Sequence, residues 1–176
     1  MKIILSLLLL TAVCLFWLTA CTGIPKGAKP VGNFQVDRYL GTWYEIARLN
    51  HSFEKNLMQV TEVYTLNKNG TLKVVNSGYD IKKKKRKEAV GKAKFVGDKN
   101  VGQLKVSFFG PFYGSYNIIA LDENYQYALV VGKDLSYLWI LSRTTSLPDN
   151  VRNEYLQTAS GLGYDTTALI WVDHNP

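Results

Sequence analysis

Few side chains in this sequence could carry out chemistry, and they are far apart. The chain of 176 residues has two histidines, His51 and His174, and two cysteines, Cys14 and Cys21. A metal centre needs several such ligands at close spacing, so this set predicts no metal site. Neither histidine accompanies a nucleophile motif such as Gly-x-Ser-x-Gly, and the glycine loop that binds phosphates is absent. The sequence therefore predicts neither a catalytic centre nor a cofactor.

Positive charge is concentrated in one run, from Lys82 to Lys87. The net charge of +7 comes from 21 Lys and Arg against 14 Asp and Glu. Six of the basic residues form this run and a seventh is Lys2, so the 14 that remain equal the acidic residues. The basic pI thus reflects one patch. A lysine-rich run can bind nucleic acid, but aromatic residues for base stacking are not found around it, and we expect no nucleic-acid partner.

Cys21 ends a candidate export signal. Lys2 precedes an apolar run over residues 3–18, which is slightly short for a membrane span. The sequence Leu18-Thr19-Ala20-Cys21 resembles the bacterial lipobox, in which the cysteine is acylated and becomes the new N-terminus. We expect residues 1–20 to be removed and Cys21 to carry lipid. An uncleaved anchor or an ordinary secretory signal is the alternative.

The residues after Cys21 predict where the protein is held. Thr22, a residue other than Asp, resembles the outer-membrane signal of enteric bacteria. Each buried acyl CH₂ adds about 0.8 kcal/mol of membrane affinity, so several chains anchor a protein almost permanently. Residues 21–32 are expected to form the lipidated cysteine and a tether of up to roughly 35 Å at ~3.3 Å per residue. The expected location is the outer membrane, with the domain facing the periplasm.

From residue 33 onward, runs rich in aromatic and β-branched residues alternate with turn signals. The chain has 11 Tyr, seven Phe and four Trp, which favour strands. The segment Asn67-Lys68-Asn69-Gly70 is typical of a hairpin turn. Eight strands are predicted, over residues 42–49, 60–66, 72–77, 89–96, 103–109, 115–121, 125–131 and 137–142.

One helix and a short strand follow. Pro148-Asp149 predicts the start of the helix, and either Gly161 or Gly163 its end. Residues 168–172 predict the final strand. Eight meandering antiparallel strands hide both sheet edges by closing into a barrel, which has room for side chains or one small ligand. The predicted fold class is all-β, an eight-stranded antiparallel up-and-down barrel with one C-terminal helix. Apolar residues recur at helical spacing in the predicted helix at Val151, Tyr155, Leu156 and Ala159.

Three segments, in order, resemble the signature regions of the lipocalins. The run Gly41-Thr42-Trp43-Tyr44-Glu45-Ile46-Ala47-Arg48 resembles the first, a Gly-x-Trp motif on the first strand. Residues 117–125 are similar to the second, and Trp139-Ile140-Leu141-Ser142-Arg143 resembles the third. Residues 107–114 and the lipobox are most similar to bacterial outer-membrane members. The resemblance covers residues 33–172, so 33–176 is expected to be one lipocalin domain.

The resemblance implies structural roles for Gly41, Trp43 and Arg143. The indole would close the narrow end of the barrel, with the guanidinium packed across it. Such a cation–π contact contributes about 0.5–2 kcal/mol.

Strand alternation then predicts which neighbours face the interior. Glu45 and Ala47 would point inward with Trp43, and Trp139 and Leu141 with Arg143. An interior carboxylate needs a partner, a water or a raised pKa. Glu45 is therefore either a hydrogen-bonding group of the barrel floor or a polar contact near the ligand.

In the lipocalin topology, the links after strands one, three, five and seven surround the open end of the barrel. The basic run, residues 108–113 and residues 134–136 would lie there. Cations and aromatics at an entrance fit an anionic head group above an acyl chain, or docking onto a membrane. A solvated loop that only aids solubility is the alternative. The candidate ligand-binding residues are Glu45, Ala47, Phe108, Phe112, Tyr113, Tyr116, Trp139 and Leu141.

The resemblance implies a membrane-anchored carrier rather than an enzyme. It would bind or transport fatty acids or lysophospholipids through apolar burial, for storage or maintenance of the cell envelope. Two alternatives stay open. One is an enzyme on the same barrel that acts on an apolar substrate, and the other is an envelope interaction protein without a lipid ligand. Similar proteins form homodimers, but nothing in this sequence establishes one.

Overall fold

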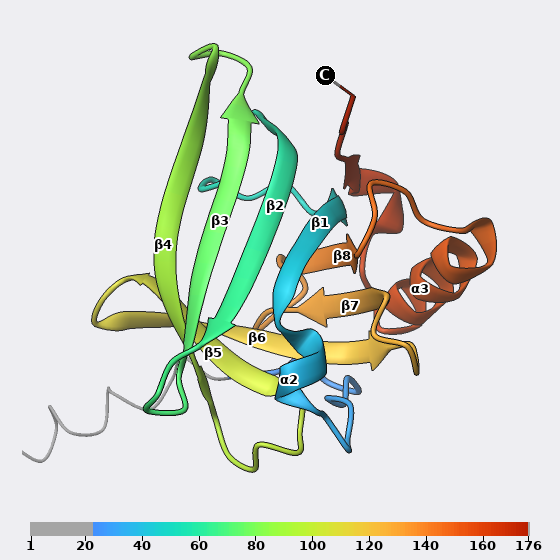
Figure 1. Cartoon of the computed structure of the whole chain (residues 1–176). Helices are drawn as coiled ribbons and strands as arrows, with labels where there is room; N and C mark the ends of the chain where they lie inside the picture. The colour runs from blue at the N-terminus through green and yellow to red at the C-terminus, as the bar shows by residue number, and fades with distance from the viewer. Residues whose placement is uncertain (1–22, 176) are drawn as a thin grey trace, which may run out of the picture.

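The central element of the fold is one antiparallel sheet that closes on itself (Figure 1). The computed structural model describes residues 23–175, so the expected leader, Cys21 and Thr22 lie outside the described residues. The strand order is β2-β3-β4-β5-β6-β7-β8-β1-β9, and β2 also pairs with β1. This pairing confirms the eight-stranded barrel. The strands are β1 Gly41–Arg48, β2 Leu57–Leu66, β3 Leu72–Asp80, β4 Lys85–Phe95, β5 Gln103–Phe109, β6 Phe112–Leu121, β7 Tyr127–Val131, β8 Leu138–Ser142 and β9 Ile170–Trp171.

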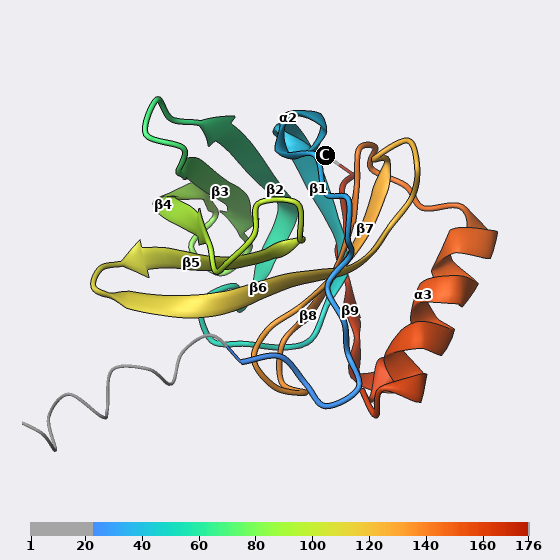
Figure 2. The ribbon, with the colours of Figure 1, turned by 90° about the horizontal axis from the view of Figure 1, so that it is seen from below.

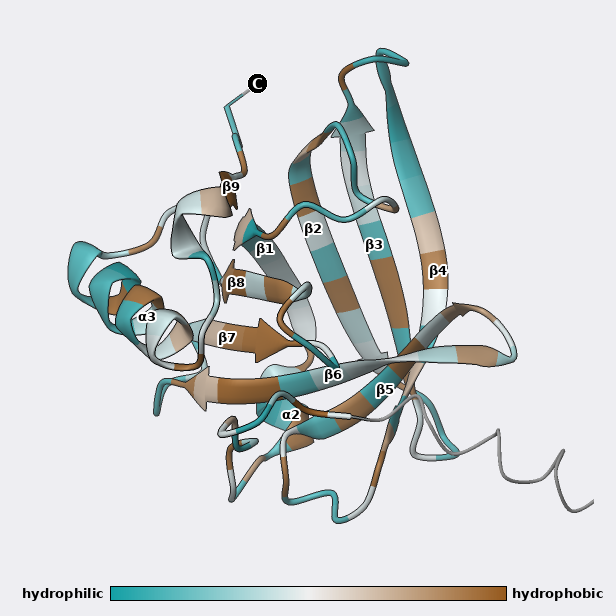
Figure 3. Ribbon diagram, turned by 180° about the vertical axis from the view of Figure 1, so that it is seen from behind, coloured by the Kyte–Doolittle hydropathy of each residue, from teal (hydrophilic) through white to brown (hydrophobic). Residues whose placement is uncertain are grey.

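Two apolar clusters lie on the two sides of the barrel wall. The interior cluster includes Trp43, Val74 and Leu141. The second cluster joins Leu129 and Ile140 to the helix α3, Asp149–Gly161, which lies along the outside of β7 and β8 (Figure 2). Strand β7 is therefore covered on both faces, which explains why it is strongly hydrophobic (Figure 3). The C-terminal helix prediction is confirmed.

Strands β3 and β4 are longer than predicted. The prediction ended the third strand at residue 77 and began the fourth at residue 89, after the basic run. In the structure the ladder continues until Asp80 pairs with Lys85, which leaves a turn over residues 81–84 only. Half of the basic run, residues 85–87, is therefore part of a paired strand, so the hairpin fixes its backbone.

The C-terminal segment fills a gap in the barrel wall. Strands β1 and β2 pair only as far as Tyr44 and Thr61. Beyond this point the Val172 amide donates to the Ile46 carbonyl at 2.9 Å, and the Gln59 amide donates to the Asp173 carbonyl at 2.8 Å. The final strand is shorter than the predicted 168–172, because a 3₁₀ turn, Thr166–Ala168, takes its first residues.

The N-terminal segment follows the barrel wall. The Val31 amide donates to the Ile118 carbonyl at 2.8 Å, and the Asn117 side chain donates to the Gly23 carbonyl at 3.3 Å. Residues 23–32 are thus bound to the barrel rather than forming a free tether. The short helix α2, Val36–Tyr39, then covers one end of the barrel, opposite the β3–β4 hairpin (Figure 1). Among residues 23–175, no helix is both long and apolar enough to cross a membrane.

Candidate functional site in the barrel interior

Trp43 and Arg143 form the closed end of the barrel. The Arg143 guanidinium carbon lies 3.9 Å from the centroid of the indole ring, which has no exposed surface. The guanidinium also donates to the carbonyl oxygens of Thr42 and Arg38, both at 2.8 Å. Gly41 has a φ of +91°, a left-handed conformation that favours glycine, and it brings the chain past Arg143. These residues therefore close one end of the barrel.

A chain of hydroxyl groups lies above Trp43. The hydroxyl oxygens of Tyr39 and Tyr116 are 2.7 Å apart, and those of Tyr64 and Tyr116 are 2.8 Å apart. Tyr64 also hydrogen-bonds to Glu62. Burial raises the pKa of Glu62 to about 7. The sequence analysis selected Tyr116 but missed Glu62 and Tyr64, although alternation along the predicted strand 60–66 places both on one face.

A second polar group surrounds Glu45. Its Oε1 atom accepts from Arg48 Nη1 at 2.5 Å, and Arg48 Nη2 donates to the Glu54 carbonyl at 2.9 Å. Trp139 Nε1 donates to the Glu54 side chain at 3.2 Å. Burial raises the pKa of Glu45 well above its usual value, with repulsion from Glu54 as the next cause, and burial also raises the pKa of Glu54. Glu45 thus has both a cationic partner and a raised pKa, and it has no exposed surface.

His51 completes this group from the link between β1 and β2. Its ring stacks on Phe53 at 4.1 Å between centroids and lies beside Trp139. His51 Nε2 is 3.3 Å from Glu54 Oε2. Burial, followed by repulsion from Arg48, lowers the pKa of His51 to about 4. The ring is therefore neutral at pH 7, and the contact with Glu54 is not an ion pair at that pH.

The predicted inward direction of Ala47 is wrong. A β-bulge between Glu45 and Ala47 shifts the register with β8. The shift turns Ala47 into the outer cluster under α3, while Arg48 takes the inward direction. Trp139 and Leu141 do belong to the interior cluster. A bulge of this kind has no signal in the local sequence, so alternation alone predicts the wrong side.

The aromatic segment at the β5–β6 hairpin is divided between the two faces. Phe108 packs against the interior cluster. Phe112 is 76% exposed at the hairpin tip. Tyr113 lies on the outer wall, where the ammonium groups of Lys94 and Lys105 are 5.5 and 5.4 Å from its ring centroid. Phe112 and Tyr113 were predicted as ligand contacts in a link at the open end, whereas β6 begins at Phe112, three residues earlier than the predicted 115, and takes both into the strand.

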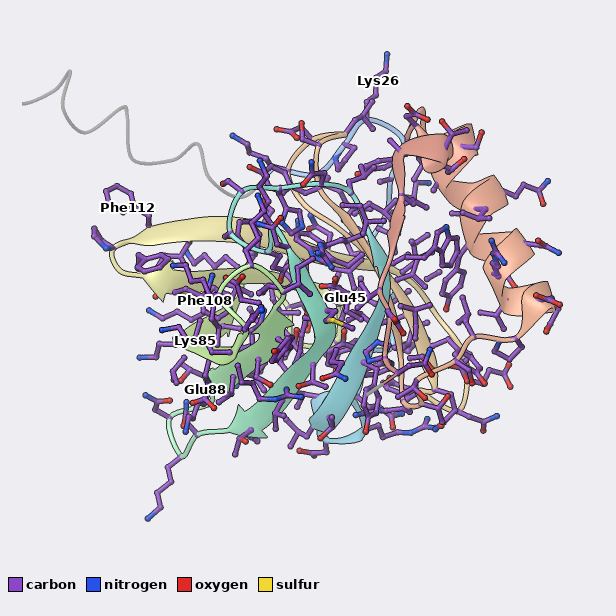
Figure 4. All side chains as sticks on the ribbon, turned by 90° about the horizontal axis from the view of Figure 1, so that it is seen from above. Lys26, Glu45, Lys85, Glu88, Phe108 and Phe112 are labelled. Carbon is purple, nitrogen blue, oxygen red and sulfur yellow. The ribbon has the colours of Figure 1, made fainter. Side chains whose placement is uncertain are left out.

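The interior is filled at the closed end and accessible at the open end. The inward-facing Leu72, Ala93 and Leu104 are buried, with at most 2% exposed surface. Further toward the open end, Val106 and Phe108 pack on the same cluster but are only partly buried. Figure 4 shows Phe108 on the side of Lys85 and Phe112, whereas Glu45 lies nearer the centre of the view. The accessible apolar inner residues identified near the open end, Val106 and Phe108, therefore come from β5.

The basic run borders the open end. Lys87 Nζ lies 2.5 Å from Asp80 Oδ2, and this contact lowers the pKa of the Asp80 carboxyl. Asp80 also accepts from the backbone amides of Lys82 and Lys83. The β3–β4 turn is thus tied down by one carboxylate, while the side chains of residues 82–84 stay exposed. Residues 23–175 contain no group of three or more His, Cys, Asp and Glu side chains placed to hold a metal ion.

Comparison with known proteins agrees with this geometry. Residues 34–174 match the family model of the lipocalin-like domain. The chain is 49% identical to the outer membrane lipoprotein Blc of Citrobacter freundii, over 89% of this chain and 90% of that protein. It is 48% identical to the Blc of Escherichia coli K12, over 94% of each. It is also 35% identical to temperature-induced lipocalin-1 of Arabidopsis thaliana, over 82% of this chain and 81% of that protein.

The fold has a close counterpart among solved structures. Insecticyanin from the tobacco hornworm Manduca sexta superimposes with a TM-score of 0.70 and 22% identity, over 87% of each chain. A closed barrel of eight strands with a helix packed outside and an arginine over the first-strand tryptophan defines a lipocalin. The protein belongs to the lipocalin family, and its bacterial relatives are named outer membrane lipoproteins.

Proposed function

We propose that this protein is a membrane-anchored lipocalin that binds or transports a fatty acid or lysophospholipid in its barrel. The observation that carries the proposal is the pair of apolar inner residues Val106 and Phe108 on β5, which pack on the interior cluster and stay partly exposed near the open end. Apolar burial at about 25 cal/mol per Å² supplies the affinity, and an acyl chain offers a large apolar surface. The polar groups around Glu45 and Glu62 lie deeper and are enclosed, so they shape the floor of the site.

The anchor is the second part of the proposal. Acylation of Cys21 would hold the domain at the outer membrane, facing the periplasm, where it would store or move lipids during maintenance of the envelope. The names of the bacterial relatives support an outer-membrane lipoprotein. We assign no reaction to the protein. Glu45, the residue that an enzymatic role would use, has no exposed surface and is paired with Arg48.

Phe108 provides the direct test of ligand binding. We expect Phe108→Ser to lower the affinity for oleate or a lysophospholipid roughly 30-fold, because one buried phenyl ring contributes about 2 kcal/mol. The affinity is measured by displacement of a fluorescent fatty acid. The matched control is Phe109→Ser, which removes the adjacent ring at the hairpin tip, where it is 78% exposed. Equal affinities in the two variants would place the ligand outside the barrel.

A further inference from the structure

The open end of the barrel carries an unusual set of exposed apolar side chains. We define the open-end rim as the links after β1, β3, β5 and β7, which share one end because consecutive strands are antiparallel. Each link, or the residues that border it, exposes at least one large apolar side chain. These are Phe53, Ile81, Phe109, Phe112 and Leu135, which are 54, 51, 78, 76 and 44% exposed. Apolar surface in this amount is costly in water and indicates a contact surface.

The rim is also the most positively charged part of the molecule. The turn residues Lys82, Lys83 and Lys84 are exposed, and Lys85 follows them. Two carboxylates adjoin the run, Asp80, which is paired with Lys87, and Glu88, so the six cations of residues 82–87 leave a surplus of four positive charges over residues 80–88. Figure 4 places Lys85 and Phe112 on the same side of the molecule. Cations interleaved with aromatic rings are complementary to an anionic lipid surface, into which the rings can enter.

The position of the N-terminal segment gives an independent argument. Gly23 lies against Lys133 in the β7–β8 link, where a β-carbon on Gly23 would be 3.5 Å from the Lys133 carbonyl oxygen. Only Thr22 separates Gly23 from Cys21. Since consecutive Cα atoms are 3.8 Å apart, a chain of two residues beyond Gly23 can reach at most about 8 Å from its Cα. A lipid on Cys21 would therefore be attached next to the rim.

We propose that the open-end rim docks onto the anionic phospholipid surface of the membrane that holds the anchor. The lysines of the β3–β4 turn contact the phosphate layer, and Phe109 and Phe112 enter the boundary between head groups and acyl chains. The inference rests on the proposed Cys21 anchor but not on a particular barrel ligand. Docking in this orientation sets the accessible inner surface against the lipids, so an acyl chain can pass between membrane and barrel without crossing water.

The test measures which end of the barrel contacts lipid. The full chain, as its bacterial host processes it, is reconstituted into vesicles with an environment-sensitive fluorophore on Leu135→Cys at the rim or on Lys68→Cys at the closed end. The unsubstituted chain, treated with the same label, is the blank for Cys14 and Cys21. We expect a blue shift of the Leu135 label in phosphatidylglycerol vesicles, a smaller shift in phosphatidylcholine vesicles, and no shift of the Lys68 label in either.

Matched variants separate charge from apolar contact. We expect Lys82→Gln with Lys83→Gln and Lys84→Gln to remove the preference for phosphatidylglycerol, and Phe109→Ser with Phe112→Ser to remove most of the shift. Two control variants change the closed end and should leave the shift intact. One replaces Lys68, Lys73 and Lys99 with Gln, and the other replaces Leu66 and Val96 with Ser. Displacement of a fluorescent fatty acid, measured on every variant, reports barrel binding separately from docking.

Three results would overturn docking. The first is a shift of the rim label that is equal in both vesicle types and is unchanged in the triple-glutamine variant. The second is a response from the Lys68 label instead, which would turn the closed end to the membrane. The third is a shift of the rim label on adding soluble RNA that matches the shift with vesicles, which would assign the lysines to polyanions in general.

Discussion

Three acidic side chains lie inside the barrel, and their raised pKa values favour protonation of those that no cation neutralises. Glu45, Glu54 and Glu62 are all buried, and burial raises the pKa of each. Arg48 pairs with only one of them, through Glu45 Oε1. The Glu45 Oε2 and Glu54 Oε1 atoms have no hydrogen-bond partner among the described residues. A proton on a carboxyl of this group therefore costs less than a second buried charge.

Stability should consequently depend on pH through Glu62. Its pKa of about 7 in the folded state lies above the ordinary value of 4.5. Between these values the folded state keeps a proton that the unfolded state has released, so stability is full below pH 4.5 and falls as the pH rises to 7. We expect Glu62→Gln to flatten this fall. The unfolding free energy of the variant minus that of the parent, measured by urea unfolding, should rise by roughly 3 kcal/mol between pH 4.5 and pH 8.

The comparison with the parent matters because His51 acts in the opposite direction. Its pKa is lowered to about 4, so its contribution to stability is present above pH 6.5 and is lost as the pH falls. The difference between Glu62→Gln and the parent cancels the His51 contribution. Glu88→Gln, which changes an exposed carboxyl on β4, is the control and should follow the parent. Parallel curves for all three proteins would contradict the buried, protonated state of Glu62.

At the scale of elements, the seam between β4 and β5 determines the shape of the accessible inner surface. A β-carbon on Gly91 would lie 2.8 Å from two ring carbons of Phe108 and from the Ser107 carbonyl oxygen. The absence of a side chain at this position lets the phenyl ring approach β4 closely. The register shift between Val106 and Phe109 in the β5–β6 pair lies at the same place. A glycine and a bulge on neighbouring strands therefore set the position of the ring that we assign to ligand contact.

A methyl group at residue 91 should disturb this seam. We expect Gly91→Ala to displace the Phe108 ring and part of β5, because a contact of 2.8 Å with backbone oxygen is too close for carbon. The expected results are a loss of about 1–3 kcal/mol in unfolding free energy and weaker binding of a fluorescent fatty acid. Gly97→Ala is the control, because a β-carbon there would meet nothing within 4 Å. Equal stability of the two variants would show that the seam tolerates side chains.

At the scale of the whole molecule, the barrel has opposite ends with different roles. The closed end is sealed by α2, Trp43 and Arg143, and polar groups fill the layers above it. The open end combines accessible apolar side chains, the basic turn and the N-terminal residue Gly23 beside Lys133. Ligand entry, membrane contact and anchoring are thus proposed for one side of the molecule. The helix α3 and the C-terminal segment cover the wall between the ends.

Much of this architecture could be predicted from the sequence, because it depends on patterns that recur. Strand alternation and turn signals predicted the barrel, and Trp43 and Arg143 belong to spaced signatures. Ala47 and Tyr113 were misplaced because a bulge or a hairpin extension reverses direction without a compositional signal. The role of Glu62 was missed for a different reason. Alternation places Glu62 beside Tyr64 on one face of the predicted strand, but the hydrogen bond from Tyr64 to Tyr116 joins separate strands and is seen only in the structure.

The measurement that tests the central claim most directly is native mass spectrometry of residues 22–176, purified from a bacterial host without detergent. The account predicts a discrete added mass that, after extraction, is a fatty acid or a lysophospholipid. The same spectrum reports whether one barrel or a pair of barrels carries it. A bare mass that stays bare after incubation with oleate and with lysophospholipids would contradict the carrier function.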